Sequence, residues 1–159
     1  MRLWHQKLIH YLPNKQLLGQ HRELAALRGL GWGRKHKTVD YVFTHPYSLL
    51  FDYHWIVIKE LKERGYKVDT SWEVRNYRGK TLKYQYPYSK FIVGDDHRFR
   101  NVYKFATMPE TIDTDMIYPE HNDEYLRECL LNLKEKNVKL LNGTSIEKEL
   151  MKLDLKGIT

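Results

Sequence analysis

The sequence predicts a mainly α-helical protein that folds as an irregular bundle of three to four helices. Apolar residues recur every three to four positions in several stretches, and residues that favour helix ends bound these stretches. Residues 81–105 have instead an alternating aromatic pattern that is typical of strands. A chain of 159 residues can bury one modest core, so we expect a single domain over residues 1–159.

The first two predicted helices supply most of this core. One begins with Asn14 as its cap and stops at Gly29. Its apolar stripe comprises Leu17, Leu18, His21, Leu24, Ala25 and Leu27. The other covers residues 48–64 and ends at Gly65. His54 lies on the stripe of this second helix, which predicts a buried, hydrogen-bonded imidazole rather than a catalytic one.

Two more helices are predicted towards the carboxyl end. Asp123 and Glu124 follow Asn122, so acidic side chains would lie in the positively polarised first turn of a helix. That helix would bury Leu126, Cys129, Leu130 and Leu133. Thr144 and Glu147 have the spacing of a capping box, which predicts a short last helix. Its apolar face would contain Ile146, Leu150 and Leu153.

The pattern of residues 81–105 predicts an aromatic insertion between the second and third predicted helices, either a β-hairpin or an ordered loop. Tyr84, Tyr86 and Tyr88 alternate, and a turn signal follows at residues 94–96. Because the aromatic residues are interleaved with Lys and Arg, they suit stacking on unpaired bases, but they equally suit packing against the helices.

The sequence predicts no metal site and no cofactor. The eight histidines are scattered, without an HExxH motif or a paired His/carboxylate spacing. Asp95, Asp96 and His97 could gather around a divalent ion, but adjacent acids in a turn are typical turn formers. Cys129 is the only cysteine, which excludes disulfides within the chain and cysteine-based zinc sites and favours a reducing cytoplasm. No stretch has the apolar length of a membrane span, so we expect no membrane partner.

The charge of the chain is concentrated in its first two thirds. The formal net charge is +7, but residues 1–109 carry +11 and residues 110–159 carry −4. This distribution predicts a nucleic-acid face in the first segment and a solvated support in the second. A generic basic protein is the alternative interpretation of the net charge.

Glu23 is the only carboxylate in residues 1–39. The bases around it are Arg2, Lys7, Lys15, Arg22, Arg28, Arg34, Lys35 and Lys37. A polyanion drawn to this region would meet one isolated carboxylate, as expected where an acid acts on nucleic acid. Alternatively, Glu23 could simply pair with a basic neighbour such as Arg22 or Arg28.

Residues 29–38 form a glycine-rich basic stretch directly after the first helix. Three glycines accompany Arg34, Lys35, His36 and Lys37, which predicts a loop whose backbone and side chains contact phosphates. A plain surface connection is the alternative.

Five segments occur in a characteristic order and spacing. They are Arg2-Leu3, Leu17-Leu18 with Arg22-Glu23-Leu24, Arg34-Lys35-His36, Arg64-Gly65-Tyr66 and Ile117-Tyr118-Pro119-Glu120-His121. Together, over residues 1–66 and 117–136, the chain resembles the phage-type endonuclease V family of pyrimidine-dimer DNA glycosylases. Enzymes of this family cut the glycosidic bond and then nick the abasic strand.

The resemblance implies a metal-independent mechanism in which the residue before Arg2 supplies a nucleophilic amine. That residue is Met1 here, where the family usually has a threonine, because the bulky Arg2 should prevent removal of the initiator methionine. An α-amino group has a pKa of about 7.7 to 8.0, so part of it is neutral and nucleophilic near pH 7. Glu23 would act as acid and base, and Arg2 and Arg22 would hold phosphates.

Two positions on the first helix differ from the family. His21 stands where the family has an aromatic residue, and Ala26 stands where it has an arginine, for which Arg28 would substitute. The predicted DNA-binding residues are therefore Arg2, Arg22, Arg28, Arg34, Lys35, His36 and Lys37.

We therefore predict a DNA repair glycosylase with abasic-site lyase activity, acting as a monomer on damaged double-stranded DNA at the nucleoid in the cytoplasm. A non-catalytic DNA- or RNA-binding module with the same fold is the alternative. A nuclease or processing factor acting on RNA also stays open, because backbone charge and base stacking serve both nucleic acids.

Overall fold

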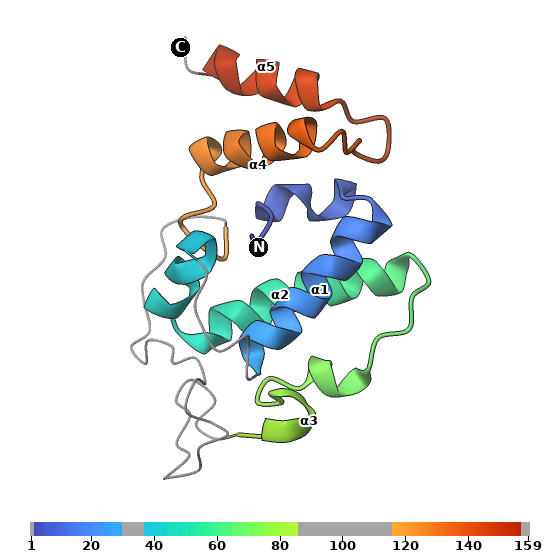
Figure 1. The fold of residues 1–159 in the computed structure, drawn as a ribbon, viewed down its shortest axis with the longest axis vertical. Helices are drawn as coiled ribbons and strands as arrows, with labels where there is room; N and C mark the ends of the chain where they lie inside the picture. The colour runs from blue at the N-terminus through green and yellow to red at the C-terminus, as the bar shows by residue number, and fades with distance from the viewer. Residues whose placement is uncertain (1, 30–36, 86–115, 157–159) are drawn as a thin grey trace.

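The protein is built from short helices around a central helix pair (Figure 1). The computed structural model describes residues 2–29, 37–85 and 116–156. Its elements are η1 (Gln6–Tyr11), α1 (Asn14–Arg28), η2 (Lys37–Thr44), α2 (Tyr47–Glu63), η3 (Thr70–Glu73), α3 (Gly79–Leu82), α4 (Asp123–Glu135) and α5 (Ile146–Lys156). Within the described residues the regular structure is helical and no strand occurs, which confirms the predicted mainly α bundle.

Helices α1 and α2 form the central pair and pack along their apolar stripes (Figure 1). The fully buried leucines and valine of this interface are Leu17, Leu24 and Leu27 from α1 and Leu50, Val57 and Leu61 from α2. Burial of each such side chain contributes about 1.5 to 3 kcal/mol to folding. The buried leucines of α1 follow the predicted stripe, but Leu18, His21 and Ala25 are only partly buried. His54, on the predicted stripe of α2, is buried.

Both central helices end where predicted, but α1 begins differently. Gly29 caps α1, and Gly65 follows α2 with φ 92°, a left-handed conformation that glycine adopts without strain. The prediction that Asn14 caps α1 is wrong, because Pro13 is the cap residue and Asn14 is the first residue of the helix. The side-chain oxygen of Asn14 instead accepts a hydrogen bond from Nη1 of Arg64 at 3.0 Å.

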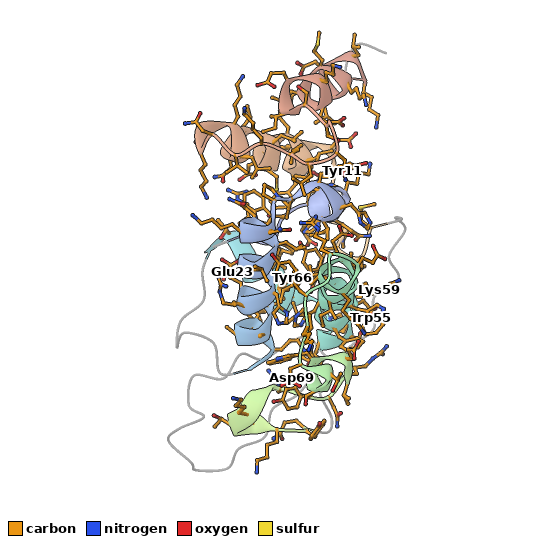
Figure 2. All side chains as sticks on the ribbon, turned by 90° about the vertical axis from the view of Figure 1, so that its right-hand side faces the viewer. Tyr11, Glu23, Trp55, Lys59, Tyr66 and Asp69 are labelled. Carbon is orange, nitrogen blue, oxygen red and sulfur yellow. The ribbon has the colours of Figure 1, made fainter. Side chains whose placement is uncertain are left out.

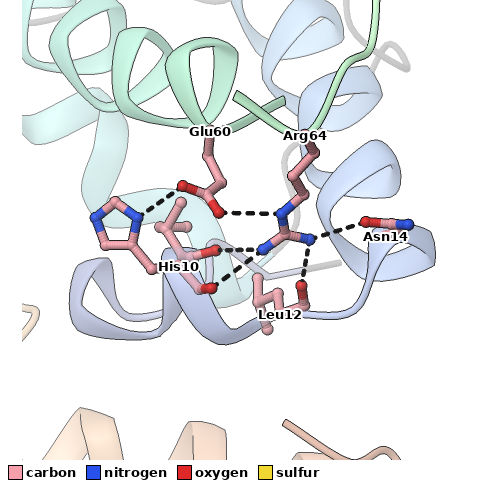
Figure 3. A network of polar contacts seen from close by, with 6 residues as sticks. His10, Leu12, Asn14, Glu60 and Arg64 are labelled. Atoms are coloured by element: carbon pink, nitrogen blue, oxygen red, sulfur yellow. Dashed lines mark hydrogen bonds and ion pairs between the residues drawn. The ribbon is translucent and has the colours of Figure 1, made fainter. Parts of the chain in front are cut away.

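The Arg64 guanidinium joins the end of α2 to the turn between η1 and α1 (Figure 3). Its Nε donates to Glu60 at 3.0 Å, its Nη1 to the Leu12 carbonyl at 2.6 Å and its Nη2 to the His10 carbonyl at 3.2 Å. Glu60 also contacts Nδ1 of His10 at 2.7 Å. Burial alone would raise the pKa of Glu60, but the hydrogen bonds from His10 and Arg64 lower it. This network holds the amino-terminal segment against α2.

Helices α4 and α5 pack together and form a layer next to η1 (Figure 1). As predicted, Asn122 caps α4, and its side chain accepts from the Tyr125 N–H at 2.9 Å. The capping box predicted with Thr144 is shifted by one residue, because Ser145 Oγ accepts from the Lys148 N–H at 3.3 Å. The predicted buried residues of α4 are all buried, and Ile146 of α5 is buried as well.

The predicted aromatic insertion is described only as far as residue 85. In that part, α3 ends at Leu82, and Tyr77 and Tyr84 form one isolated antiparallel bridge. Residues 86–105, where the β-hairpin or ordered loop is predicted, lie outside the described residues.

Candidate active site

Gln20 organises the surroundings of Glu23. It lies one helical turn before Glu23 on α1, and its amide nitrogen donates both to Glu23 Oε2 and to the Arg2 carbonyl, each at 3.1 Å. Its amide oxygen accepts from the Trp4 N–H at 2.7 Å and from the Tyr53 hydroxyl at 3.1 Å. Because Gln20 is only 1% exposed, these bonds hold the backbone of residues 2–4 beside the Glu23 carboxylate.

The Glu23 carboxylate is half-buried in a positively charged surrounding. Burial raises its pKa, while the charges of Arg22 and Lys136 act in the opposite direction. Lys136 caps the end of α4, and its Nζ lies 5.8 Å from the centre of the Trp4 ring. A carboxylate in this position can accept a proton from a bound substrate, which is the requirement for a general base.

Sequence reasoning missed both Gln20 and Lys136. The spacing of three residues between Gln20 and Glu23 is a local signal that could have indicated their contact on a helix. Lys136 has no such signal, because it belongs to the acidic last third of the chain and meets the site only through the packing of α4.

Arg2 and Arg22 have different surroundings. The Arg2 side chain is 15% exposed and lies 3.4 Å from Glu128, and its guanidinium is 6.0 Å from the Trp4 ring centre and 5.9 Å from that of Tyr125. Arg22 is exposed and has no ion-pair partner among the described residues.

The alternative that Glu23 pairs with Arg22 or Arg28 does not hold in the described part of the chain. Neither arginine forms an ion pair or hydrogen bond with Glu23 there. Gln20 is the contact that holds the carboxylate.

The predicted contact of Arg28 with DNA is wrong, because this side chain is 0% exposed. Its acceptors are Tyr47 Oη at 2.8 Å, His54 Nδ1 at 2.9 Å and the carbonyls of Trp72, Val74 and Tyr77 at 2.8, 2.9 and 2.9 Å. A guanidinium has five N–H donors, so all of them are used inside the protein. Arg28 therefore connects α1 to α2 and to residues 72–77 instead of facing a phosphate.

His54 is confirmed as a buried, hydrogen-bonded imidazole. It is 0% exposed, and its two ring nitrogens contact Arg28 Nη1 at 2.9 Å and His21 Nδ1 at 2.8 Å. Burial, followed by the charge of Arg28, keeps the pKa of His54 well below its usual range. His54 is therefore neutral near pH 7.

Figure 2 shows Glu23 on the outer side of α1, and Trp55 and Lys59 on the other side of the central helix pair. Trp55 and Lys59 line a hollow of about 350 Å³ together with residues of η1. This hollow is separate from the surface around Glu23.

Several predicted site residues fall in parts of the chain that the structure does not describe. Met1, Arg34, Lys35 and His36 lie outside the described residues, and Lys37 is described only as the first residue of η2. Among the residues that the structure describes, no group of three or more His, Cys, Asp or Glu side chains could hold a metal ion. No described helix is both long and apolar enough to cross a membrane.

Comparison with protein families gives a match to the amino-terminal segment. Residues 1–74 match the family described as pyrimidine dimer DNA glycosylase. Neither the curated proteins nor the solved structures include a match to the chain. The matched segment contains Glu23, Gln20 and the three residues that Gln20 contacts besides Glu23. Over residues 1–74, the chain is therefore similar to the pyrimidine dimer DNA glycosylase family.

Proposed function

We propose that this protein is a DNA glycosylase with abasic-site lyase activity on damaged duplex DNA, and that Met1 and Glu23 perform the chemistry. The bridging amide of Gln20 is the observation that carries the proposal. It contacts the Arg2 carbonyl and the Glu23 carboxylate at 3.1 Å each. The bridge holds Arg2, the residue to which Met1 is covalently bonded, close to the Glu23 carboxylate, which supports the proposal.

The proposed reaction uses the α-amine as nucleophile. The amine attacks C1′ of the damaged nucleotide, the glycosidic bond breaks, and the base leaves with the bonding electrons and takes up a proton. Loss of the amine protons and opening of the sugar then give an imine at C1′. Glu23 removes a proton from C2′, the electrons move towards the imine, and the C3′–O bond breaks to nick the strand. Water finally hydrolyses the imine and frees the amine.

The surroundings of Glu23 suit both of its proposed tasks. The carboxylate must be ionised to stabilise positive charge at C1′ and to accept the C2′ proton. Burial raises the pKa of Glu23, and the positive charges of Arg22 and Lys136 limit this rise, which favours the ionised form. The exposed guanidinium of Arg22 is suited to bind a phosphate next to this carboxylate.

Glu23→Gln tests the role of the carboxylate. The amide keeps the shape of the side chain but has neither the charge nor the basicity, so cleavage of abasic DNA should fall by about 100-fold or more while DNA affinity stays equal or rises. Single-turnover cleavage and equilibrium binding measure the two effects. Glu124→Gln on the exposed first turn of α4 is the matched control and should cleave as the parent does. Parental cleavage by Glu23→Gln would show that another group is the base.

Borohydride trapping on an abasic duplex tests the amine. The parent protein should form a covalent adduct at Met1, and acetylation or one added amino-terminal residue should abolish it, because either change removes or displaces the only amine of low pKa. Trapping that persists in the blocked protein would assign the imine to a lysine such as Lys7 or Lys15. Absence of trapping in the free protein would favour the non-catalytic binding module.

The proposed DNA face continues into the basic stretch after α1. Replacing Arg34, Lys35 and Lys37 together by alanine should reduce the slope of log affinity against log salt by about 0.9 for each phosphate that the variant no longer neutralises. An unchanged slope would place the DNA face elsewhere. We also propose that the protein acts at the nucleoid in the cytoplasm, where the buried free thiol of Cys129 stays reduced.

A further inference from the structure

A chain of three hydrogen-bonded side chains leads from the interior to the surface of α1. Arg28 Nη1 lies 2.9 Å from His54 Nδ1, and His54 Nε2 lies 2.8 Å from His21 Nδ1. Arg28 and His54 are both 0% exposed, whereas His21 is half-buried and directly precedes the exposed Arg22. The series of hydrogen bonds therefore ends at a partly exposed residue that is next to Arg22 in the sequence of α1.

The direction of every hydrogen bond in this chain follows from the guanidinium. Arginine can only donate, so Nδ1 of His54 must accept and carries no proton. Neutral His54 then has its proton on Nε2 and donates it to Nδ1 of His21. In neutral His21 the proton is consequently on Nε2. The two nitrogens of an imidazole point in nearly opposite directions, so this N–H faces away from His54.

Neither imidazole can take a second proton without breaking one of these hydrogen bonds. A proton on His54 Nδ1 would face the guanidinium, and a proton on His21 Nδ1 would face the Nε2–H of His54. Burial lowers the pKa of His21, and the positive charges of Arg28 and Arg22 lower it further. His21 is thus held as a neutral donor, and no described residue accepts from its Nε2.

We propose that His21 is a further DNA-contacting residue, a neutral donor to a backbone phosphate oxygen whose tautomer Arg28 sets through His54. Arg28 and His54 are then positioning residues, and the contact adds affinity without adding charge. This inference rests on the proposed function, because it requires DNA on the Arg22 side of α1.

The tautomer can be tested in the free protein by long-range ¹H–¹⁵N NMR. His21 should have a protonated Nε2 and an unprotonated Nδ1 throughout pH 6 to 8. The variant His54→Gln can still accept from Arg28 and donate to His21, so it should keep this tautomer, whereas His54→Leu should release it. A proton on Nδ1 of His21 in the parent protein would overturn the inference whether or not the protein binds DNA.

The contact itself is tested with a duplex that contains a non-cleavable tetrahydrofuran abasic site. His21→Phe should bind about 2- to 13-fold more weakly, the range for one neutral hydrogen bond, and its salt slope should equal that of the parent. Arg22→Gln should instead reduce the slope by about 0.9. His10→Phe, a histidine change in the distant η1 network, should bind as the parent does.

The outcomes separate this inference from the proposed function. If the parent binds the duplex and His21→Phe binds equally well, the inference fails and the proposed function stands. If His21→Phe lowers the salt slope by about 0.9, His21 is a cation in the complex and the neutral-donor inference fails as well. If the parent itself does not bind the duplex, the proposed function fails together with the inference, although the NMR result still reports the tautomer.

Discussion

Two arginines on α1 should respond in opposite ways to the same substitution. Arg28 is fully buried and donates all five of its hydrogen bonds inside the protein, whereas Arg22, six residues earlier, is exposed. Methionine has a similar length and apolar stem but cannot donate hydrogen bonds. We expect Arg28→Met to lower stability and leave the salt dependence of DNA binding unchanged. Arg22→Met should leave stability nearly unchanged and reduce the salt dependence of DNA binding.

The magnitude for Arg28→Met follows from the groups that would be left without a donor. These are the carbonyls of Trp72 and Val74 and the side chains of Tyr47 and His54. The Tyr77 carbonyl keeps a donor, because the Tyr47 hydroxyl also donates to it at 3.3 Å. Each buried acceptor left without a donor costs about 1 to 3 kcal/mol. Val74 is 42% exposed, so water can reach its carbonyl, and the expected decrease in stability is at least about 3 kcal/mol. This is a large part of the total stability of about 5 to 15 kcal/mol of a domain.

Urea unfolding followed by circular dichroism measures the first effect, and the salt dependence of duplex binding measures the second. For Arg22→Met, the free energy of unfolding should change by less than about 0.5 kcal/mol and the salt slope should fall by about 0.9. For Arg28→Met, the slope should be parental at a temperature where the variant is folded. A stable Arg28→Met protein with a reduced slope would refute the assignment of Arg28 to the interior.

Two further predictions concern titratable groups. Burial lowers the pKa of His5 to about 4 and that of His121 to about 3, so below pH 6.5 the unfolded chain binds protons that the folded protein does not. Burial also lowers the pKa values of His54 and His21. As the pH falls towards 5, the free energy of unfolding should therefore decrease, and each such histidine should contribute up to roughly 1.4 kcal/mol per pH unit. His121→Gln should reduce the slope by about that amount in urea titrations, and an unchanged slope would contradict this origin. Lys136→Met removes a charge that lowers the pKa of Glu23, so the acidic limb of the cleavage rate against pH should move to higher pH, while Lys134→Met should leave it in place. An unmoved limb in Lys136→Met would contradict the electrostatic effect of Lys136 on Glu23.

The helices themselves could be predicted from the sequence because their signals are local. Gly65 ends α2 through its left-handed backbone, and Asn122 caps α4 through a bond to a residue three positions later. The predictions of Asn14 and Thr144 as cap residues were wrong, because a residue type that favours a cap can also bond elsewhere or lie next to another candidate. The Asn14 side chain accepts a hydrogen bond from Arg64, 50 residues away. Ser145, the residue after Thr144, accepts a hydrogen bond from the backbone N–H of Lys148 at the start of α5.

The candidate site divides in the same way. The isolation of Glu23 among bases is a property of the sequence, and it singles out one carboxylate without any coordinates. The sequence does not show whether a basic residue faces DNA or the core, because the same residue type occurs in both environments. Arg28 lies seven residues after His21 on one helix face, but its five acceptors come from α2 and from residues 72–77. Lys136 reaches Glu23 from 113 positions away along the chain. Only tertiary packing could decide these two positions, since burial and charge proximity depend on segments that have no local relation to each other.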